Sequence, residues 1–165
     1  IITNIMKTVP EKVPFENGNE LELILESSIL PRILAPNKLN SGDRFIFMKY
    51  SGIPVIEGTS MALSSVGDAY INFGEFGGCI FMFFYGFLFN QFLKLFYRKS
   101  KDFPIAILLT TVVFYYPIRP DCELQTILGH LFKSTIIMFF ILSVWKHEFK
   151  LIDFSLKRKR KEFAF

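Results

Sequence analysis

GGCIFMFFYGFLFNQFLKLF, at residues 77–96, is the first of three apolar stretches that decide the fold of this chain. The other two are FPIAILLTTVVFYYPI at residues 103–118 and LQTILGHLFKSTIIMFFILSVW at residues 124–145. A bilayer core of about 30 Å is crossed by a helix of roughly 20 apolar residues, and the first and third stretches reach that length. The sequence therefore predicts an all-α, polytopic membrane protein with three transmembrane helices in this chain.

Basic residues near the ends of these stretches predict how they are oriented, because Lys and Arg resist translocation across an energised membrane. The turn at 97–102 and the tail at 146–165 are rich in Lys and Arg, whereas residues 57–76 contain neither and the turn at 117–123 contains only Arg119. We therefore expect residues 1–76 and 117–123 outside the membrane, and residues 97–102 and 146–165 in the cytoplasm. The basic tail also fits a nucleic-acid patch, but beside a membrane span the simpler interpretation is anchoring to anionic lipid.

The overall composition agrees with this division into regions. The chain is 51% hydrophobic, has 21 Phe residues and carries a net charge of +4, yet residues 1–76 hold more acidic than basic side chains. It starts at Ile1 without a signal-peptide pattern, so we expect it to be the C-terminal part of a longer protein that contributes at least one earlier span. Three regions are predicted: an extracytoplasmic loop at 1–76, a three-span bundle at 77–145 and a basic cytoplasmic tail at 146–165.

Short helices are expected within the outer loop. Residues 1–18 are polar and contain two prolines, which indicates a loop, and residues 19–30 alternate leucine and isoleucine with glutamate, which predicts an amphipathic helix. A further short helix is expected at 43–50. Residues 58–74 are too polar to span a bilayer and too apolar for a free loop, so they favour a re-entrant or interfacial helix.

Candidate chemistry is concentrated in the turn between the second and third stretches. Arg119, Asp121 and Glu123 place one cation and two acids at the outer mouth of two spans. One interpretation is an Arg119–Asp121 pair that caps the turn. The other is that Arg119 binds a phosphate or pyrophosphate through its planar fork, while Asp121 or Glu123 acts as a base or orients it. Both stay open at this point, and His130 and Lys133 on the third stretch are weaker candidates.

Several motifs together resemble one family, the bacterial oligosaccharide repeat-unit polymerases, also called O-antigen or capsular polysaccharide polymerases. The resemblance covers about residues 25–135. Two departures are Asp68, where the family usually has Glu, and Pro120, where it often has Gly. The motifs are Pro31-Arg32, Pro36-Asn37-Lys38, Gly58-Thr59-Ser60, the run GDAYINFG at residues 67–74, Gly77-Gly78 and Arg119-Pro120-Asp121.

The resemblance implies a multi-pass glycosyltransferase of the bacterial inner membrane, which transfers a growing glycan from undecaprenyl pyrophosphate to an incoming lipid-linked repeat unit on the outer side. It implies no cofactor or metal, and as partners the lipid-linked oligosaccharide, membrane lipids, a flippase and a chain-length regulator, but no nucleic acid. A ligase using the same carrier, a transporter or flippase, and a non-catalytic assembly subunit are the alternatives. The implied catalytic residues are Arg119, with Asp121 or Asp68 as the base, and the implied substrate-binding residues are Arg32, Lys38, Arg44, Tyr70, Asn72 and His130.

Overall fold

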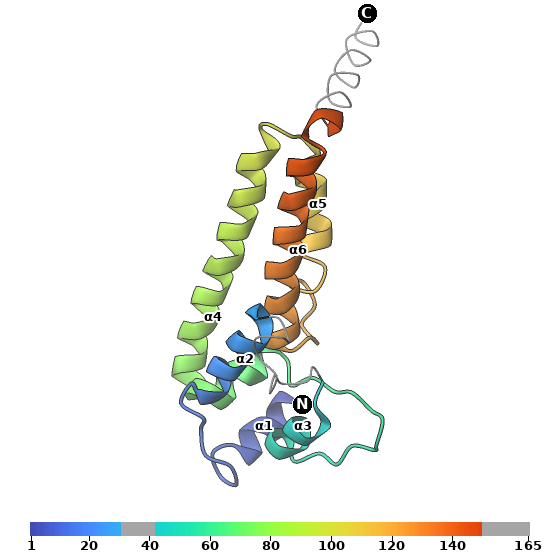
Figure 1. The fold of residues 1–165 in the computed structure, drawn as a ribbon. Helices are drawn as coiled ribbons and strands as arrows, with labels where there is room; N and C mark the ends of the chain where they lie inside the picture. The colour runs from blue at the N-terminus through green and yellow to red at the C-terminus, as the bar shows by residue number, and fades with distance from the viewer. Residues whose placement is uncertain (31–41, 150–165) are drawn as a thin grey trace, which may run out of the picture.

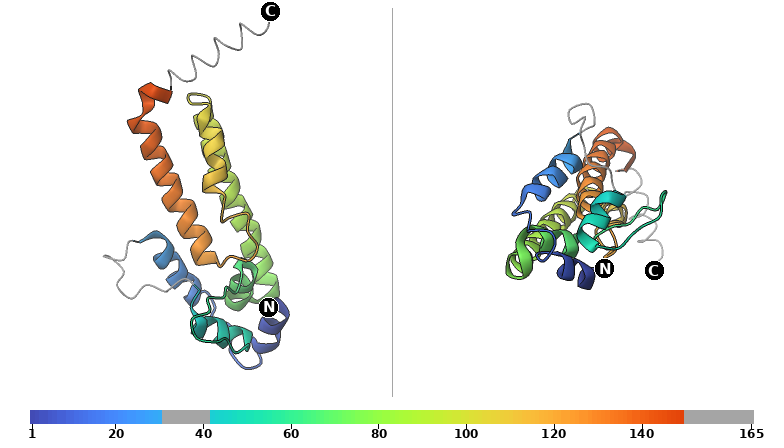
Figure 2. Two further views of the ribbon diagram at one scale, coloured as in Figure 1. Left: turned by 90° about the vertical axis from the view of Figure 1, so that its right-hand side faces the viewer. Right: turned by 90° about the horizontal axis from the view of Figure 1, so that it is seen from below.

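A computed structural model describes residues 1–30 and 42–149, and in these ranges it is all-helical, without strands (Figure 1). Two long helices, α4 and α6, run alongside each other, and the short helix α5 lies beside them at the end away from the N-terminus (Figures 1 and 2). Three short helices gather at the other end. The helices are α1 (Ile2–Thr8), α2 (Asn19–Ile29), α3 (Arg44–Ser51), α4 (Ser65–Ser100), α5 (Ile105–Val113) and α6 (Leu124–Val144).

Two of the described helices, α4 and α6, are long and apolar enough to cross a membrane. Helix α6 has 21 residues, and at 1.5 Å per residue it is about 32 Å long. The expected helix over 103–118 is wrong in extent, because α5 has only 9 residues and covers about 14 Å. Hydrogen-bonded turns follow α5, such as the one from the Ile118 amide to the Phe114 carbonyl at 3.2 Å.

Helix α4 begins twelve positions earlier than the predicted first span, at Ser65, and contains a break at Gly74. Gly74 has φ 69° and ψ −166°, a backbone conformation that is nearly exclusive to glycine. Of the helix expected at 58–74, residues 65–73 are helical and residues 58–64 are not. The break turns residues 65–73 toward the short helices. We refer to residues 1–30 and 42–73 as the cap, and to residues 75–144 as the bundle.

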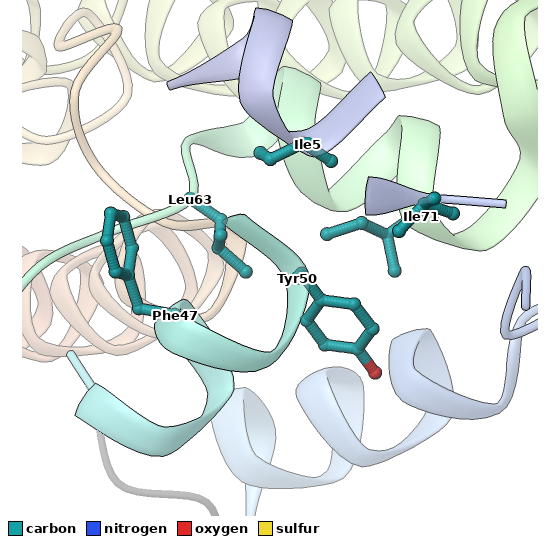
Figure 3. Packing of buried hydrophobic residues seen from close by; sticks show 6 residues of the cluster. Ile5, Phe47, Tyr50, Leu63 and Ile71 are labelled. Carbon is teal, nitrogen blue, oxygen red and sulfur yellow. The ribbon is translucent and has the colours of Figure 1, made fainter. Parts of the chain in front are cut away.

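The cap has a small core of its own, built partly by a helix that the sequence did not predict. Residues 2–8 form α1, so the expectation of a loop throughout 1–18 was wrong. Ile5 of α1 is fully buried in this core, and Tyr50 of α3 and Ile71 of α4 pack around it (Figure 3). Burying these side chains stabilises a helix too short to form alone.

The predicted helices at 19–30 and 43–50 are confirmed as α2 and α3. Asp43 caps α3, because its carboxylate accepts a hydrogen bond of 2.8 Å from the Phe45 amide. Helix α2 packs along the first turns of α6, where the Ser28 hydroxyl donates to the Gln125 carbonyl at 3.1 Å. The cap is therefore fixed to the beginning of α6.

The bundle is held together by aromatic side chains and exposes an apolar outer surface. Phe92 and Phe96 of α4 meet Phe132 and Phe139 of α6 with ring centroids 5.4 Å apart in each pair. Large apolar residues also point outward, among them Phe76, which is 82% exposed. Such a surface is unfavourable in water, so these helices need either lipid or further protein around them.

Candidate functional site

The principal candidate site is a groove of about 380 Å³ where the cap meets the bundle. One side is formed by residues 60–62 of the cap, and the other by the turn that joins α5 to α6. Arg119 and Asp121, both predicted as catalytic residues, line this groove. The side chains that matter for its chemistry are Ser60, Met61, Tyr116, Arg119, Asp121 and Glu123.

Arg119 and Asp121 form an exposed, two-point ion pair at the rim of this groove. The Arg119 Nη2 lies 2.7 Å from Asp121 Oδ2, and its Nε lies 3.2 Å from Oδ1. The guanidinium carbon is 5.9 Å from the centroid of the Tyr116 ring. The hydrogen bonds from Arg119 lower the pKa of Asp121, and those same contacts raise the pKa of Arg119. The pairing expected in the first interpretation is thus present, and it makes Asp121 a weak proton acceptor.

Asp68 lies in the interior, next to the groove, and is 4% exposed. Its Oδ2 accepts a hydrogen bond of 2.9 Å from the backbone amide of Leu124, the first residue of α6. Helix starts have amides without intrahelical partners, and a carboxylate there is also favoured by the helix dipole. Asp68 therefore caps α6 from a distant part of the chain.

Glu123 is the residue that immediately precedes α6, and its carboxylate connects α6 to the cap. Both of its oxygens lie 3.0 Å from the Gly42 amide, and Oε1 also accepts from the Thr126 hydroxyl at 2.9 Å. Glu123 and Asp68 together hold the start of α6 against the cap.

A small cavity of about 30 Å³ adjoins the groove, and Met61 and Glu123 line both. Glu20, from α2, also lines this cavity and is only 8% exposed. Its Oε2 is buried without a hydrogen-bond partner among the described residues. Burial and the nearby charge of Glu16 raise the pKa of Glu20 to about 7.

Glu20 was not among the predicted site residues, because residues 19–30 were interpreted only as an amphipathic helix with a glutamate-rich face. A signal was available: Glu20 is four positions before Ile24 and eight before Ser28, so the three share one helix face. That face is buried, and it carries Glu20 into the interior with it.

Other predicted substrate-binding residues lie outside the lining of the groove. The Tyr70 hydroxyl donates to the Val9 carbonyl at 3.2 Å, inside the cap. Asn72 is buried, and its side-chain oxygen accepts from the Leu21 amide at 3.1 Å. Both residues hold cap segments together in this structure.

The remaining predicted residues are also dispersed. His130 Nε2 lies 2.8 Å from the Val112 carbonyl, so it connects α6 to the end of α5. The Arg44 guanidinium is 4.9 Å from the centroid of the Phe45 ring and belongs to α3. Arg32 and Lys38 lie outside the described residues. Among residues 1–30 and 42–149, no three His, Cys, Asp or Glu side chains are arranged to hold a metal ion.

Comparison with known proteins places the chain in a family. No curated protein and no solved structure matches the chain. The sequence profile of a family described as a domain of unknown function, DUF8712, matches residues 1–153. Because this match covers nearly the whole chain, the protein belongs to the DUF8712 family.

Proposed function

We propose that the chain is part of a membrane glycosyltransferase that polymerises lipid-linked oligosaccharide repeat units on the outer side of the bacterial inner membrane. The observation that carries this proposal is the position of Arg119, in a groove between the cap and a bundle with an apolar outer surface. A lipid pyrophosphate has its tail in the bilayer and its charged head at the interface. A cation at such a junction meets the head group where the tail is still in lipid.

The proposed membrane arrangement has three spans, with the middle one formed by α5 and the turns that follow it. Helices α4 and α6 support this arrangement, because their outward faces are apolar. Arg98 and Lys99 lie in the last turn of α4, at the end far from the cap. In the proposed orientation the cap and residues 117–123 face outward, and residues 97–102 and the tail at 146–165 face the cytoplasm.

In the proposed reaction, Arg119 stabilises the negative charge that develops on the pyrophosphate as it leaves the donor sugar. A guanidinium suits this role because it binds phosphate oxygens at two points. Its pair with Asp121 is exposed to water, and exposed ion pairs contribute little free energy. A pyrophosphate can therefore displace Asp121 from Arg119 at small cost.

The test is the chain-length distribution of surface glycan in cells that lack the full-length gene and carry wild-type or variant protein at matched membrane expression. Arg119→Ala is expected to leave surface glycan of single repeat units only, without the ladder of longer chains that wild type produces. Arg119→Lys is expected to restore at most part of it, because an ammonium lacks the two-point fork. Arg98→Ala, which removes an exposed arginine at the opposite end of the bundle, is the matched control and is expected to leave the ladder unchanged.

Other results would support the other functions. An unchanged ladder in Arg119→Ala cells would reduce Arg119 to a cap of its turn. Full-length glycan that accumulates on the lipid carrier would indicate a ligase. Loss of all surface glycan, single units included, would indicate a transporter or flippase.

A further inference from the structure

Glu20 differs from the other acids that surround the small cavity. Asp68 accepts a hydrogen bond from the Leu124 amide, Glu123 from the Gly42 amide, and Asp43 from the Phe45 amide. Each of these three carboxylates is thus held by backbone. The Glu20 Oε2, although buried, accepts no hydrogen bond from any described residue. Buried polar groups are nearly always paired, so an unpaired one calls for an explanation, and a catalytic role is one of them. The Tyr85 hydroxyl and Thr135 Oγ1 are also buried without a partner among the described residues, but neither residue lines the cavity.

The cavity is suited to a small hydrogen-bond donor. Its volume of about 30 Å³ accommodates a group the size of one hydroxyl or one water molecule. Apart from the acids and Gln125, its walls are apolar, formed by Ile24, Ile46, Phe47, Met61 and Leu63. Of the four acids that line the cavity, Asp43, Asp68 and Glu123 already accept hydrogen bonds from backbone amides, so the Glu20 Oε2 is the acceptor without a partner among the described residues.

The cavity is also close to Arg119. Met61 and Glu123 line both the cavity and the groove that contains Arg119. The proposed reaction needs an acceptor sugar in the groove that directs one hydroxyl toward Glu20 while the donor pyrophosphate contacts the guanidinium.

We infer that Glu20 is the proton acceptor of the transfer reaction and receives the proton of the attacking sugar hydroxyl; this rests on the proposed function. The hydroxyl oxygen forms a bond to the anomeric carbon of the donor glycan. The bond from that carbon to the pyrophosphate oxygen breaks, and undecaprenyl pyrophosphate leaves with the electron pair. The proton passes to the Glu20 Oε2. Glu20 thus takes the role that the resemblance gave to Asp121 or Asp68, whose carboxylates are already held by Arg119 and by the start of α6.

The electrostatic surroundings of Glu20 are consistent with this role. Its pKa is raised to about 7, chiefly by burial, and a base works best when its pKa is near the operating pH. Glu16 raises the pKa further, and Lys49 lowers it. Burial raises the pKa of Asp68 as well, to about 8, so the unpaired Oε2 of Glu20, and not its pKa, distinguishes it from Asp68. The ionisable groups that face Glu20 are Glu16 before α2, Asp43, Lys49 and Tyr50 at α3, Asp68 of α4 and Glu123 before α6.

The experiment uses membranes that contain the full-length protein, supplied with purified lipid-linked repeat units over a range of pH. Polymer formation and the amount of bound repeat unit are both measured. Glu20→Gln is expected to lower the polymerisation rate at least about 100-fold without changing binding, because glutamine has the same shape but does not accept the proton. Glu22→Gln, on the exposed side of the same helix, is the matched control and is expected to behave as wild type. The wild-type rate is expected to fall as the pH drops below about 7.

Three results would overturn the inference. If Glu20→Gln polymerises at the wild-type rate while Arg119→Ala does not polymerise, Glu20 is not the base and the proposed polymerase remains. If Asp68→Asn loses the rate and Glu20→Gln keeps it, Asp68 is the base. If the wild-type membranes form no polymer from a repeat unit that they bind, the proposed function itself fails, and the role of Glu20 fails with it. Thermal unfolding of Glu20→Gln, expected at or above the wild-type temperature, separates a loss of chemistry from a loss of folding.

Discussion

Asp68 illustrates how a single acid can connect two distant parts of a chain. Its carboxylate is buried within the cap and accepts a hydrogen bond from the first backbone amide of α6. Asp68→Ala removes the acceptor and leaves that amide buried without a partner, which is expected to lower the free energy of unfolding by about 1–3 kcal/mol. Asp68→Asn keeps an acceptor oxygen and is expected to cost less. Thermal unfolding of the purified protein in detergent measures both, and equal stability of Asp68→Ala and wild type would contradict the capping role.

Glu20 predicts a dependence of stability on pH. Its pKa in the folded protein is about 7, above the ordinary value of 4.5, so the folded state holds a proton more tightly than the unfolded state. The stability that this proton contributes is complete below about pH 4.5 and is lost as the pH rises through about 7. Glu20→Gln is therefore expected to lose less stability than wild type between about pH 5 and about pH 8, because glutamine does not ionise. If the unfolding temperatures of wild type and Glu20→Gln change in parallel with pH, the pKa of Glu20 is not raised in the folded protein.

At the scale of single residues, the sequence predicted part of the candidate site. Arg119 and Asp121 are close together in the chain, so their pairing could be expected from the turn between them, and the structure confirms it. The capping role of Asp68 depends on a residue 56 positions away, and no local pattern reveals such a contact. Glu20 was missed for a different reason. Its spacing from Ile24 and Ser28 indicates the helix face on which it lies, but glutamate is seldom fully buried.

Among the elements, α4 owes its shape to Gly74. A side chain there would be strained at φ 69° and ψ −166°, and its Cβ would lie 3.4 Å from the Phe15 ring. Gly74→Ala is expected to lower the free energy of unfolding by about 1–3 kcal/mol or to straighten α4 and detach the cap. Gly86→Ala is the matched control, because Gly86 lies in the same helix with open space around it. That variant is expected to be neutral or slightly stabilising, since alanine favours helix. Thermal unfolding of both, with protease sensitivity of the cap, measures the difference, and equal behaviour would contradict the importance of the break.

Helices with a continuous hydrophobic pattern in the sequence were predicted well, and helices that depend on tertiary contacts were not. The third apolar stretch, predicted at 124–145, forms α6 at Leu124–Val144, because its length and composition leave few alternatives. Helix α1 was missed because Pro10 and Pro14 marked the segment as a loop, yet the helix ends before them and is stabilised by burial of Ile5. Helix α5 is shorter than its apolar stretch, which ends in turns at 114–118.

For the whole molecule, the proposed orientation predicts which residues a membrane-impermeant thiol reagent can reach. Cys79 and Cys122 are replaced by serine in the full-length protein, and single cysteines are then introduced by Glu57→Cys in the cap or Lys101→Cys beyond α4, both at exposed positions. In spheroplasts, Glu57→Cys is expected to be labelled at once and Lys101→Cys only after the membrane is permeabilised. The reverse pattern would invert the orientation, and labelling of both before permeabilisation would remove α4 from the membrane.

The hydrogen bond between Asp68 and the Leu124 amide also has a consequence for the order of events during synthesis. The ribosome makes Asp68 56 residues before its donor, so the cap is translated well before the residue that completes it. A nascent chain that stops before residue 124 holds Asp68 without this donor. Synthesis of the first residue of α6 thereby becomes the event that supplies the partner of Asp68.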